Sequence, residues 1–360
     1  MKIAMTHVNL PNQSKGGVAY QVHYLANALA ERGNDVTLFT FSPACSDSRY
    51  HLHSYAAPPP GLRRFQSFFF AARLARTDFS AFDVLHSHGD NYLLGRTHPQ
   101  IRTFHGSARD EAAVAVTLRR RLYQRVMIGF EAAGARVADV SVGVSEATRA
   151  RIPRISVVVP NGVSATTFHP GPKSGVPSLL FVGTTGGRKR GAFLAEVFRR
   201  EIRPRFPQAE FWSVAECPLE GEGIVNFGKV PLDTLADLYR RAWTFCLPST
   251  YEGFGIPYVE AMASGTAVVA SPNPGAKEVL ANGAFGLLAG DAELGNAINR
   301  LLGDEALRGA MAAKGVLQAR NYHWDQVAAQ YEALYRAVVE RHAAKTPRRA
   351  RLQTRRDTGR

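Results

Sequence analysis

Cysteine is scarce in this chain, and long apolar runs are absent. Only Cys45, Cys217 and Cys246 occur among 360 residues. Their number is odd and no two have the spacing of a metal site, so the sequence favours a reduced compartment such as the cytosol. No apolar run reaches the roughly 18 residues that a membrane-spanning helix needs. The first residues, MKIAMTHVNL, also lack a signal peptide's long apolar segment and cleavage site, and we expect them to form a strand.

Acidic residues are outnumbered, with 30 Asp and Glu against 44 Lys and Arg, which gives a formal net charge of +14. Half of that surplus lies in residues 341–360, where eight basic residues stand against Asp357. Because this segment has few apolar residues, we expect residues 343–360 to form a basic, disordered tail. Such a tail suits an anionic membrane surface, or serves only to keep the chain in solution. Nucleic acid is the least favoured partner, because no nucleic-acid fold signature accompanies the tail.

Strand-like and helix-like segments alternate along the chain, which indicates an α/β fold with parallel sheets. The length favours two domains. A helix is expected after Gly17, because Val18, Val22, Leu25 and Leu29 recur on one face, and a longer helix is expected over residues 110–134. Strands of the first series are expected at residues 3–8, 36–41, 84–88, 101–105 and 140–144.

A Pro- and Gly-rich string, PGPKSGVP at residues 170–177, is expected to link the two domains. We therefore expect a first domain over residues 1–170 and a second over residues 177–323. Ligands of open α/β sheets bind at the carboxyl ends of the strands, so two facing sheets would place the site in the cleft between the domains. Strands of the second series are expected at residues 179–182, 211–214, 224–227, 244–247 and 267–270.

The segment PSTYEGFGIPYVEAMASG, residues 248–265, carries the strongest functional signal. Glu252 and Glu260 stand eight positions apart around a Gly-Phe-Gly loop, and Pro257 opens an expected helix. A glycine turn and a helix N-terminus offer backbone N–H groups to an anion, and carboxylates accept hydrogen bonds from sugar hydroxyls. A nucleotide sugar has both features.

This segment resembles the Glu–seven residues–Glu signature of retaining glycosyltransferase family 4, whose members have the GT-B fold. The resemblance covers roughly residues 1–340 and implies two Rossmann-like domains whose parallel sheets face each other across a cleft. The first domain would lie on the acceptor side and the second would bind the nucleotide sugar. The last helix, about residues 324–342, would return to the first domain. Further segments resemble the family in the same order: Gly16-Gly17 with the following VAYQVHYLANALAERGNDVTLFT, His105-Gly106, DVSVGVSEATR, VVVPNGVSATTFHP and FVGTTGGRKRG.

The resemblance implies roles for the residues of the Glu motif. Glu252 would lie near the donor sugar, and Glu260 would hold the ribose hydroxyls. Gly253, Phe254 and Gly255 would offer backbone N–H groups to the sugar and the diphosphate, since glycine lets the backbone approach closely. Two ordinary surface carboxylates are the alternative.

Arg188 and Lys189, in GTTGGRKRG, are expected to stabilise the negative charge that grows on the diphosphate leaving group. The family places an Arg directly after the strand's Gly and a Lys about five residues on. Lys189 matches the second position, but Thr184 stands at the first, which leaves open whether Arg188 takes its place. Gly16 and Gly17 correspond to the family's first-domain loop, near the donor phosphates and the acceptor. A solvated basic turn and an ordinary glycine turn are the alternatives.

His105 corresponds to the family's active-site histidine, which faces the donor sugar. The leaving phosphate in retaining enzymes is described as helping to deprotonate the acceptor hydroxyl. His105 would therefore position or polarise the reacting groups and would not be the general base. A strand-end histidine bonded to backbone is the alternative. His86 and His88 could line the acceptor cleft, and no carboxylate or Cys completes a metal ligand set with them. No Asp-x-Asp pair follows a strand either, which favours catalysis without a metal or other cofactor.

Residues 58–76, PPPGLRRFQSFFFAARLAR, mix Phe with Arg. Together with the arginines of residues 119–125, this segment suits a helix that lies on anionic lipid. Equally, the Phe side chains could pack in the first-domain core while the Arg side chains stay in water.

The sequence thus predicts a retaining, metal-independent glycosyltransferase that moves a hexose from a UDP- or GDP-sugar to a hydroxyl of a glycan or lipid-linked acceptor. We expect it in the cytoplasm, peripherally at the inner face of the membrane. The alternative is a non-catalytic nucleotide-sugar-binding or scaffold protein of the same fold, for which Thr184 leaves room. The Glu pair and Lys189 disfavour a nucleotide-sugar epimerase. The lack of a G-x-G-x-x-G motif disfavours a nicotinamide-binding protein.

Overall fold

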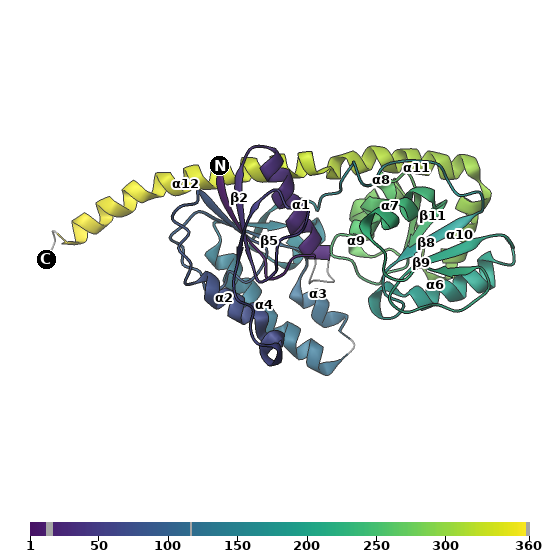
Figure 1. The fold of residues 1–360 in the computed structure, drawn as a ribbon, viewed down its shortest axis with the longest axis horizontal. Coiled ribbons are helices and arrows are strands. Elements are labelled where there is room, and N and C mark those ends of the chain that lie inside the picture. The colour runs from purple at the N-terminus through teal and green to yellow at the C-terminus, as the bar shows by residue number, and fades with distance from the viewer. Residues whose placement is uncertain (12–16, 116, 358–360) are drawn as a thin grey trace. The chain divides into compact units, whose positions relative to one another are not determined.

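The chain forms two compact α/β units (Figure 1). The computed structural model describes the backbone of residues 1–11, 17–115 and 117–357, and side chains in these ranges up to residue 344. Unit 1 consists of residues 1–160 together with the chain from Asp325 onward, and unit 2 consists of residues 161–324. Each unit is built on a parallel sheet, as the alternation of strands and helices predicted.

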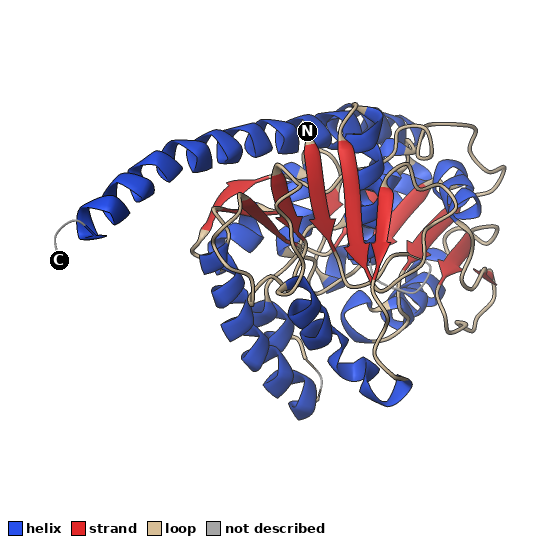
Figure 2. Cartoon of the chain, turned by 60° about the vertical axis from the view of Figure 1, so that its left-hand side comes forward, coloured by secondary structure: helices blue, strands red, loops and turns tan. Residues whose placement is uncertain are grey.

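Unit 1 contains a seven-stranded sheet in the order β3-β2-β1-β4-β5-β6-β7, in which all paired strands are parallel (Figure 2). The order reverses between β1 and β4, so the carboxyl ends of these strands form the switch point at which ligands of such sheets bind. The strands are β1 (Lys2–Thr6), β2 (Asp35–Thr40), β3 (His51–Ser54), β4 (Val84–Ser87), β5 (Gln100–Phe104), β6 (Val140–Gly143) and β7 (Ile155–Val158).

Helices α1 and α12 cover one face of this sheet, and α2 and α4 cover the other (Figure 1). On the α2 face, Phe41 and Phe70 meet edge to face with ring centroids 5.3 Å apart. On the α12 face, the Tyr335 hydroxyl lies 2.7 Å from Nδ1 of the buried His86. The helices of unit 1 are α1 (Gly17–Glu31), α2 (Gln66–Leu74), α3 (Ala108–Ala113), α4 (Leu118–Val137), α5 (Glu146–Arg151) and α12 (Trp324–Asp357).

Unit 2 contains a six-stranded parallel sheet in the order β10-β9-β8-β11-β12-β13. Helices α7, α8 and α11 lie on one side of it and α6 on the other (Figure 1). Its strands are β8 (Ser178–Val182), β9 (Glu210–Val214), β10 (Ile224–Asn226), β11 (Thr244–Leu247), β12 (Ala267–Ala270) and β13 (Leu287–Leu288). Its helices are α6 (Gly191–Val197), α7 (Leu232–Arg241), α8 (Ile256–Ala263), α9 (Pro274–Val279), α10 (Leu294–Gly303) and α11 (Glu305–Ala319).

The boundary between the units differs from the expected linker. Residues 161–170, expected in the first domain, belong to unit 2. The Val163 N–H donates to the Tyr322 carbonyl oxygen at 2.8 Å, and the Phe168 ring packs against Tyr239 at 5.8 Å. These contacts attach the segment to unit 2 before the Pro- and Gly-rich string begins.

The long helix expected over residues 110–134 is wrong, because two helices occupy this part of the chain. Helix α3 ends at Ala113, and α4 begins at Leu118. The side chain of Thr117 accepts a hydrogen bond from the Arg120 N–H and caps the new helix. A residue that competes for backbone donors in this way starts a helix more readily than it continues one.

The disordered tail was expected over residues 343–360, but α12 continues to Asp357; residues 358–360 lie outside the described part of the chain. Arginine and alanine, which supply eight of the fifteen residues 343–357, are both good helix formers. The basic composition therefore does not end the helix. Among the described residues, no helix is both long enough and apolar enough to cross a bilayer.

Candidate functional site

The Glu252 carboxylate, which follows β11, lies at the centre of a buried polar cluster in unit 2. Its Oε1 atom lies 2.7 Å from Arg188 Nη1, 2.8 Å from Lys189 Nζ and 2.7 Å from Ser249 Oγ. Glu252 is only 5% exposed. Burial disfavours its ionised form, but the charges of Lys189 and Arg188 outweigh this cost, so the pKa of Glu252 is lowered. The sequence brought these three charged residues together only through the family resemblance, and the structure places them in direct contact.

Arg188 and Lys189 lie in the loop after β8, on a short 3₁₀ turn over Gly187–Lys189. Gly187 has φ +63°, a conformation that glycine adopts without strain. The Thr250 N–H donates to the Arg188 carbonyl oxygen at 2.9 Å, and Arg188 Nη1 donates to the Tyr251 carbonyl oxygen at 2.7 Å. Backbone bonds therefore hold this basic turn against the segment that carries Glu252.

Thr184 and Arg190 in the same loop serve other contacts. The Thr184 hydroxyl donates to the Gly186 carbonyl oxygen at 2.9 Å and so closes the turn. Arg190 pairs with both carboxylate oxygens of Asp291, at 2.9 and 2.6 Å, and lies over the Phe193 ring. Arg188 and Lys189 are thus the two cations of this loop that reach Glu252.

The Gly-Phe-Gly loop is packed tightly against the start of α9. The Gly275 N–H donates to the Glu252 carbonyl oxygen at 3.1 Å. A Cβ atom at Gly275 would lie only 2.5 Å from the Phe254 carbonyl oxygen and 2.7 Å from that of Glu252, so a side chain there would displace the loop. Phe254 itself is buried, and its ring contacts Tyr322 edge to face. Its side chain anchors the loop, which leaves only its backbone for the expected role.

Glu260 lies on α8, one helix turn beyond Ile256. Burial raises the pKa of Glu260 to about 7, and the hydrogen bond from Tyr239 and the charge of Lys189 offset this only in part. Gly255, with φ +99°, supplies the left-handed residue that precedes α8. The second carboxylate of the motif differs from the first: among the described side chains no cation pairs with it at contact distance, and the Lys189 charge acts on it only from further away.

Unit 1 holds a cluster of four histidines at the carboxyl ends of β1, β4 and β5, around the switch point of its sheet. His88 Nδ1 lies 3.0 Å from His105 Nε2, and the two rings stack. His86 is fixed on both sides, by the Tyr335 hydroxyl and by Thr103 Oγ1 at 2.8 Å. Burial lowers the pKa of His7 to about 4 and that of His86 to about 3, and it lowers the pKa of His88 well below its usual value. These three imidazoles are neutral at physiological pH.

A cavity of about 580 Å³ opens near the same edge of the unit 1 sheet. It combines an aromatic wall, Phe41, with amide groups and one guanidinium, that of Arg63. Such a mixture suits a hydroxylated or anionic group. The lining residues are Asn9, Phe41, Ala57, Pro58, Arg63 and Gln66.

The expected site residues thus fall into two groups. Glu252, Glu260, the 253–255 loop and the two cations belong to unit 2, whereas His105 and Gly17, the first residue of α1, belong to unit 1. Gly16 lies outside the described residues.

Two features of the site were not predicted from the sequence. The first is Ser249, whose hydroxyl contacts Glu252, although it stands only three positions before that residue. The second is the contact of His88 with His105, which could have been suspected because both follow neighbouring strands of a parallel sheet. In the part of the chain that the structure describes, the one group of His, Cys and acidic side chains close enough to share a metal ion is His23, Cys45 and Asp47, in unit 1.

Two family models match the chain. The one described as "Glycosyltransferase Family 4" matches residues 15–167, and the one described as "Glycosyl transferases group 1" matches residues 176–304. A phosphatidyl-myo-inositol mannosyltransferase of Mycolicibacterium smegmatis is 31% identical over 287 residues, which cover 71% of this chain and 72% of that protein.

Solved structures with low sequence identity share the fold. Sucrose-phosphate synthase of Thermosynechococcus elongatus superposes with a TM-score of 0.79 at 22% identity, over 93% of this chain and 98% of the other. An Anabaena protein, HepE, in complex with UDP and glucose superposes with a TM-score of 0.71 at 15% identity, over 93% and 99%. The two parallel-sheet units are those of the GT-B fold.

Proposed function

The chain belongs to glycosyltransferase family 4 and transfers a sugar from a nucleotide sugar, and we propose that it does so with retention of configuration and without a metal ion. The donor would be a UDP- or GDP-hexose. The acceptor would be a hydroxyl of a glycan or a lipid-linked molecule. The contact of Arg188 and Lys189 with the buried Glu252 carboxylate carries this proposal.

The proposed chemistry depends on charge at the leaving group. Cleavage of the bond between the sugar and the diphosphate leaves negative charge on the phosphate oxygen, and fixed cations stabilise that charge in the transition state. Arg188 and Lys189 supply two positive charges on a turn that backbone bonds hold in place. Glu252 keeps these mutually repelling cations together and would face the hydroxyls of the donor sugar.

The remaining donor contacts follow from the loop and helix that flank Glu252. Glu260 would accept hydrogen bonds from the ribose hydroxyls. Gly253, Phe254 and Gly255 would offer backbone N–H groups, and Gly16 and Gly17 would approach the donor from unit 1. The proposal requires no metal because the two cations neutralise the diphosphate.

His105 would orient the donor sugar and the acceptor hydroxyl. In a same-face reaction the leaving phosphate oxygen accepts the acceptor's proton, so no protein base is needed for that step. His88 contacts His105 Nε2 at 3.0 Å and would hold its ring in place. The lowered pKa of His88 keeps this partner neutral.

The acceptor would enter the cavity of unit 1 near the carboxyl ends of β1 and β2. Arg63 at its wall would attract an acceptor that carries a phosphate or another anionic group. The named acceptor of the mycobacterial relative, phosphatidyl-myo-inositol, is of this kind. We propose an acceptor of the same general class for this chain.

We further propose that the protein acts in the cytoplasm, bound peripherally to the inner face of an anionic membrane. The basic end of the chain supports this, and so does an exposed face of α4. Leu118, Leu122 and Val126 recur on that face at intervals of four residues and are 80%, 61% and 52% exposed. Arginines at positions 119, 120, 121 and 125 flank them. An apolar stripe beside cations is typical of helices that lie in a membrane interface.

The α4 face can be tested with vesicles that contain an anionic phospholipid. We expect the double variant Leu122→Asp, Val126→Asp of the full chain to sediment less with these vesicles than the wild type does, because the new carboxylates are repelled by the surface. Leu317→Asp is the matched control, since Leu317 is 59% exposed on α11 of unit 2. Deletion of residues 345–360 tests the tail in the same assay. Equal sedimentation of all four proteins would contradict the membrane proposal.

The transferase proposal is tested by incubating the protein with a panel of UDP-, GDP- and ADP-sugars in the presence of a chelator. We expect nucleotide release from one donor, at a rate that the chelator does not change. Release that stops with chelator and returns with a divalent cation would contradict the metal-independent mechanism. If no donor releases its nucleotide, calorimetry with the same panel shows whether any sugar nucleotide binds. Absence of binding to all of them would contradict the function itself.

Thr184 at the position of the family's Arg favours one second candidate, a nucleotide-sugar-binding protein without catalysis. Such a protein would bind one sugar nucleotide selectively in the calorimeter and release no nucleotide with any acceptor. Retention of Glu252, Lys189 and His105 favours the transferase over this candidate.

A further inference from the structure

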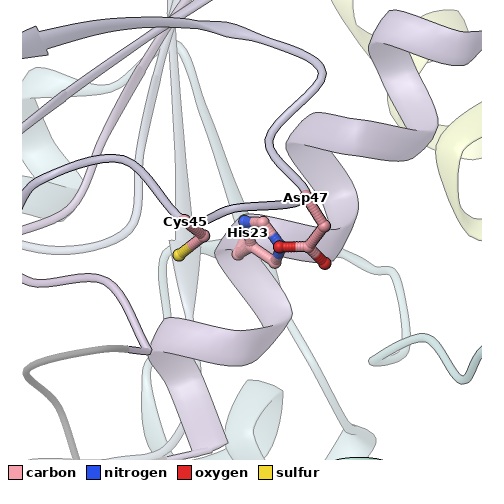
Figure 3. A group of neighbouring side chains, drawn as sticks. All are labelled: His23, Cys45 and Asp47. Carbon is pink, nitrogen blue, oxygen red and sulfur yellow. The ribbon is translucent and has the colours of Figure 1, made fainter.

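A cluster of potential metal ligands joins α1 to the loop after β2, in a part of unit 1 that the proposed chemistry does not use. His23 comes from the second turn of α1, and Cys45 and Asp47 come from the loop (Figure 3). One ligand atom from each residue lies within 4.8 Å of the ligand atoms of the other two. We propose that these three side chains bind a zinc ion.

The types of side chain select the ion. A thiolate and an imidazole are ligands that Zn²⁺ prefers, and a carboxylate completes many zinc sites, whereas Ca²⁺ and Mg²⁺ prefer oxygen ligands alone. One thiolate and one carboxylate also balance the two charges of the ion. Asp47 is 63% exposed, so the site faces solvent and leaves the fourth position of a tetrahedral ion to water.

The His23 ring is held by a hydrogen bond to its other nitrogen, an arrangement typical of metal-binding histidines. His23 is 2% exposed, and its Nδ1 lies 2.9 Å from the Tyr50 hydroxyl. The Tyr50 hydroxyl oxygen can accept a hydrogen bond from a protonated Nδ1. That tautomer leaves the Nε2 lone pair as an acceptor. Nε2 lies 3.2 Å from Asp47 Oδ1 and 3.3 Å from Asn27 Nδ2, and a cation would replace the long hydrogen bond from this amide.

The loop is pinned to α1 before any ion binds. Asn27 Nδ2 donates to the Asp47 carbonyl oxygen at 3.1 Å, and Asn27 Oδ1 accepts from the Arg49 N–H at 2.8 Å. Arg49 also pairs with Glu31 of α1 at 2.9 Å. The ligands therefore need little rearrangement to bind an ion, and a bound ion would hold the loop after β2 more firmly against α1.

This zinc would be structural, because neither Glu252 nor its two cations takes part in the cluster. The proposal therefore stands apart from the proposed transferase activity. Chelation is expected to lower the thermal stability of zinc-loaded protein while nucleotide release continues.

The test is a zinc titration of the full chain, stripped with chelator, in competition with a chromophoric chelator. We expect one zinc per chain. Asp47→Asn should weaken zinc binding by at least roughly 10- to 100-fold, the cost of losing a group that only hydrogen-bonds a metal ligand. Because the Asp47 side chain is exposed, we expect this substitution to leave the fold unchanged. Cys45→Ser should weaken binding at least as much. Cys217→Ser, which removes an exposed free thiol, is the matched control and should bind as the wild type does.

Cobalt substitution gives a second readout that reports the ligand directly. We expect a thiolate-to-cobalt charge-transfer band in the wild type and in Cys217→Ser, and none in Cys45→Ser. Zinc should also raise the melting temperature of the wild type and leave that of Asp47→Asn unchanged. Equal zinc affinity in the wild type and Asp47→Asn, or loss of the cobalt band in Cys217→Ser alone, would overturn the proposal.

Discussion

Glu252→Gln is expected to lower the turnover of sugar transfer by about 100-fold or more, the scale on which loss of one preorganised electrostatic group acts. Glutamine keeps the shape of the side chain but removes the charge that Arg188 and Lys189 both contact. The two cations then repel each other without a neutralising partner, and the donor sugar loses the carboxylate that would accept its hydroxyl hydrogen bonds. Initial rates at saturating donor and acceptor measure the effect.

Affinity for the nucleoside diphosphate should survive this change, because the cations and Glu260 remain. Glu222→Gln is the matched control, since Glu222 pairs with Arg203 at the surface and its side chain is 83% exposed. A melting curve for each variant separates loss of chemistry from loss of fold, because breaking a buried ion pair also destabilises a protein. If Glu252→Gln turned over within about twofold of the wild type, the assignment of the site would be wrong.

Lys189→Gln is expected to weaken both nucleoside diphosphate binding and transfer, with about a 10²- to 10³-fold loss of kcat/KM. The Lys189 side chain is only 15% exposed and its ammonium lies 2.8 Å from Glu252 Oε1, so the cation is largely withdrawn from water and positioned to meet a phosphate. A cation in such an environment acts more strongly than a surface lysine does. Isothermal titration with UDP and GDP measures the binding part of the effect.

The neighbouring Arg190→Gln variant removes the same charge from the same loop and serves as the control. Arg190 is engaged with Asp291 and not with Glu252, so its loss should leave nucleotide affinity nearly unchanged. The pair of variants distinguishes a specific phosphate contact from a general effect of positive charge. Equal losses in both variants would show that the loop acts only through its overall charge.

The sequence predicted most of the strands because they are buried on both faces and read as apolar runs. The three that it missed are short or exposed. Strand β3 lies at the sheet edge with the exposed residues His51, His53 and Ser54, and β13 has only two residues. Strand β7 lies at the other edge of the sheet, and only its first residue, Ile155, is buried. Edge strands bury little apolar surface, so their patterns are weak.

The sequence predicted those parts of the candidate site whose residues are close together in the chain. It did not predict contacts between residues that only the fold brings together. Glu252 and Glu260 share one motif, and Lys189 was placed by the family pattern. The contact between Arg188 and Glu252, by contrast, depends on the 3₁₀ turn after β8, which no local pattern announced. His23 lies 22 positions before Cys45, and nothing in the sequence joins the helix to the loop.

The return of α12 to unit 1 has a consequence for synthesis of the protein on the ribosome. The His86 ring in the centre of the unit 1 sheet bonds to Tyr335, 249 positions further along the chain, and Arg32 and Asn34 bond to Glu332. These partners emerge only after unit 2 has been made in full. Unit 2 has all its strands in one continuous stretch and can fold during translation, whereas the part of the protein made first must wait for the part made last.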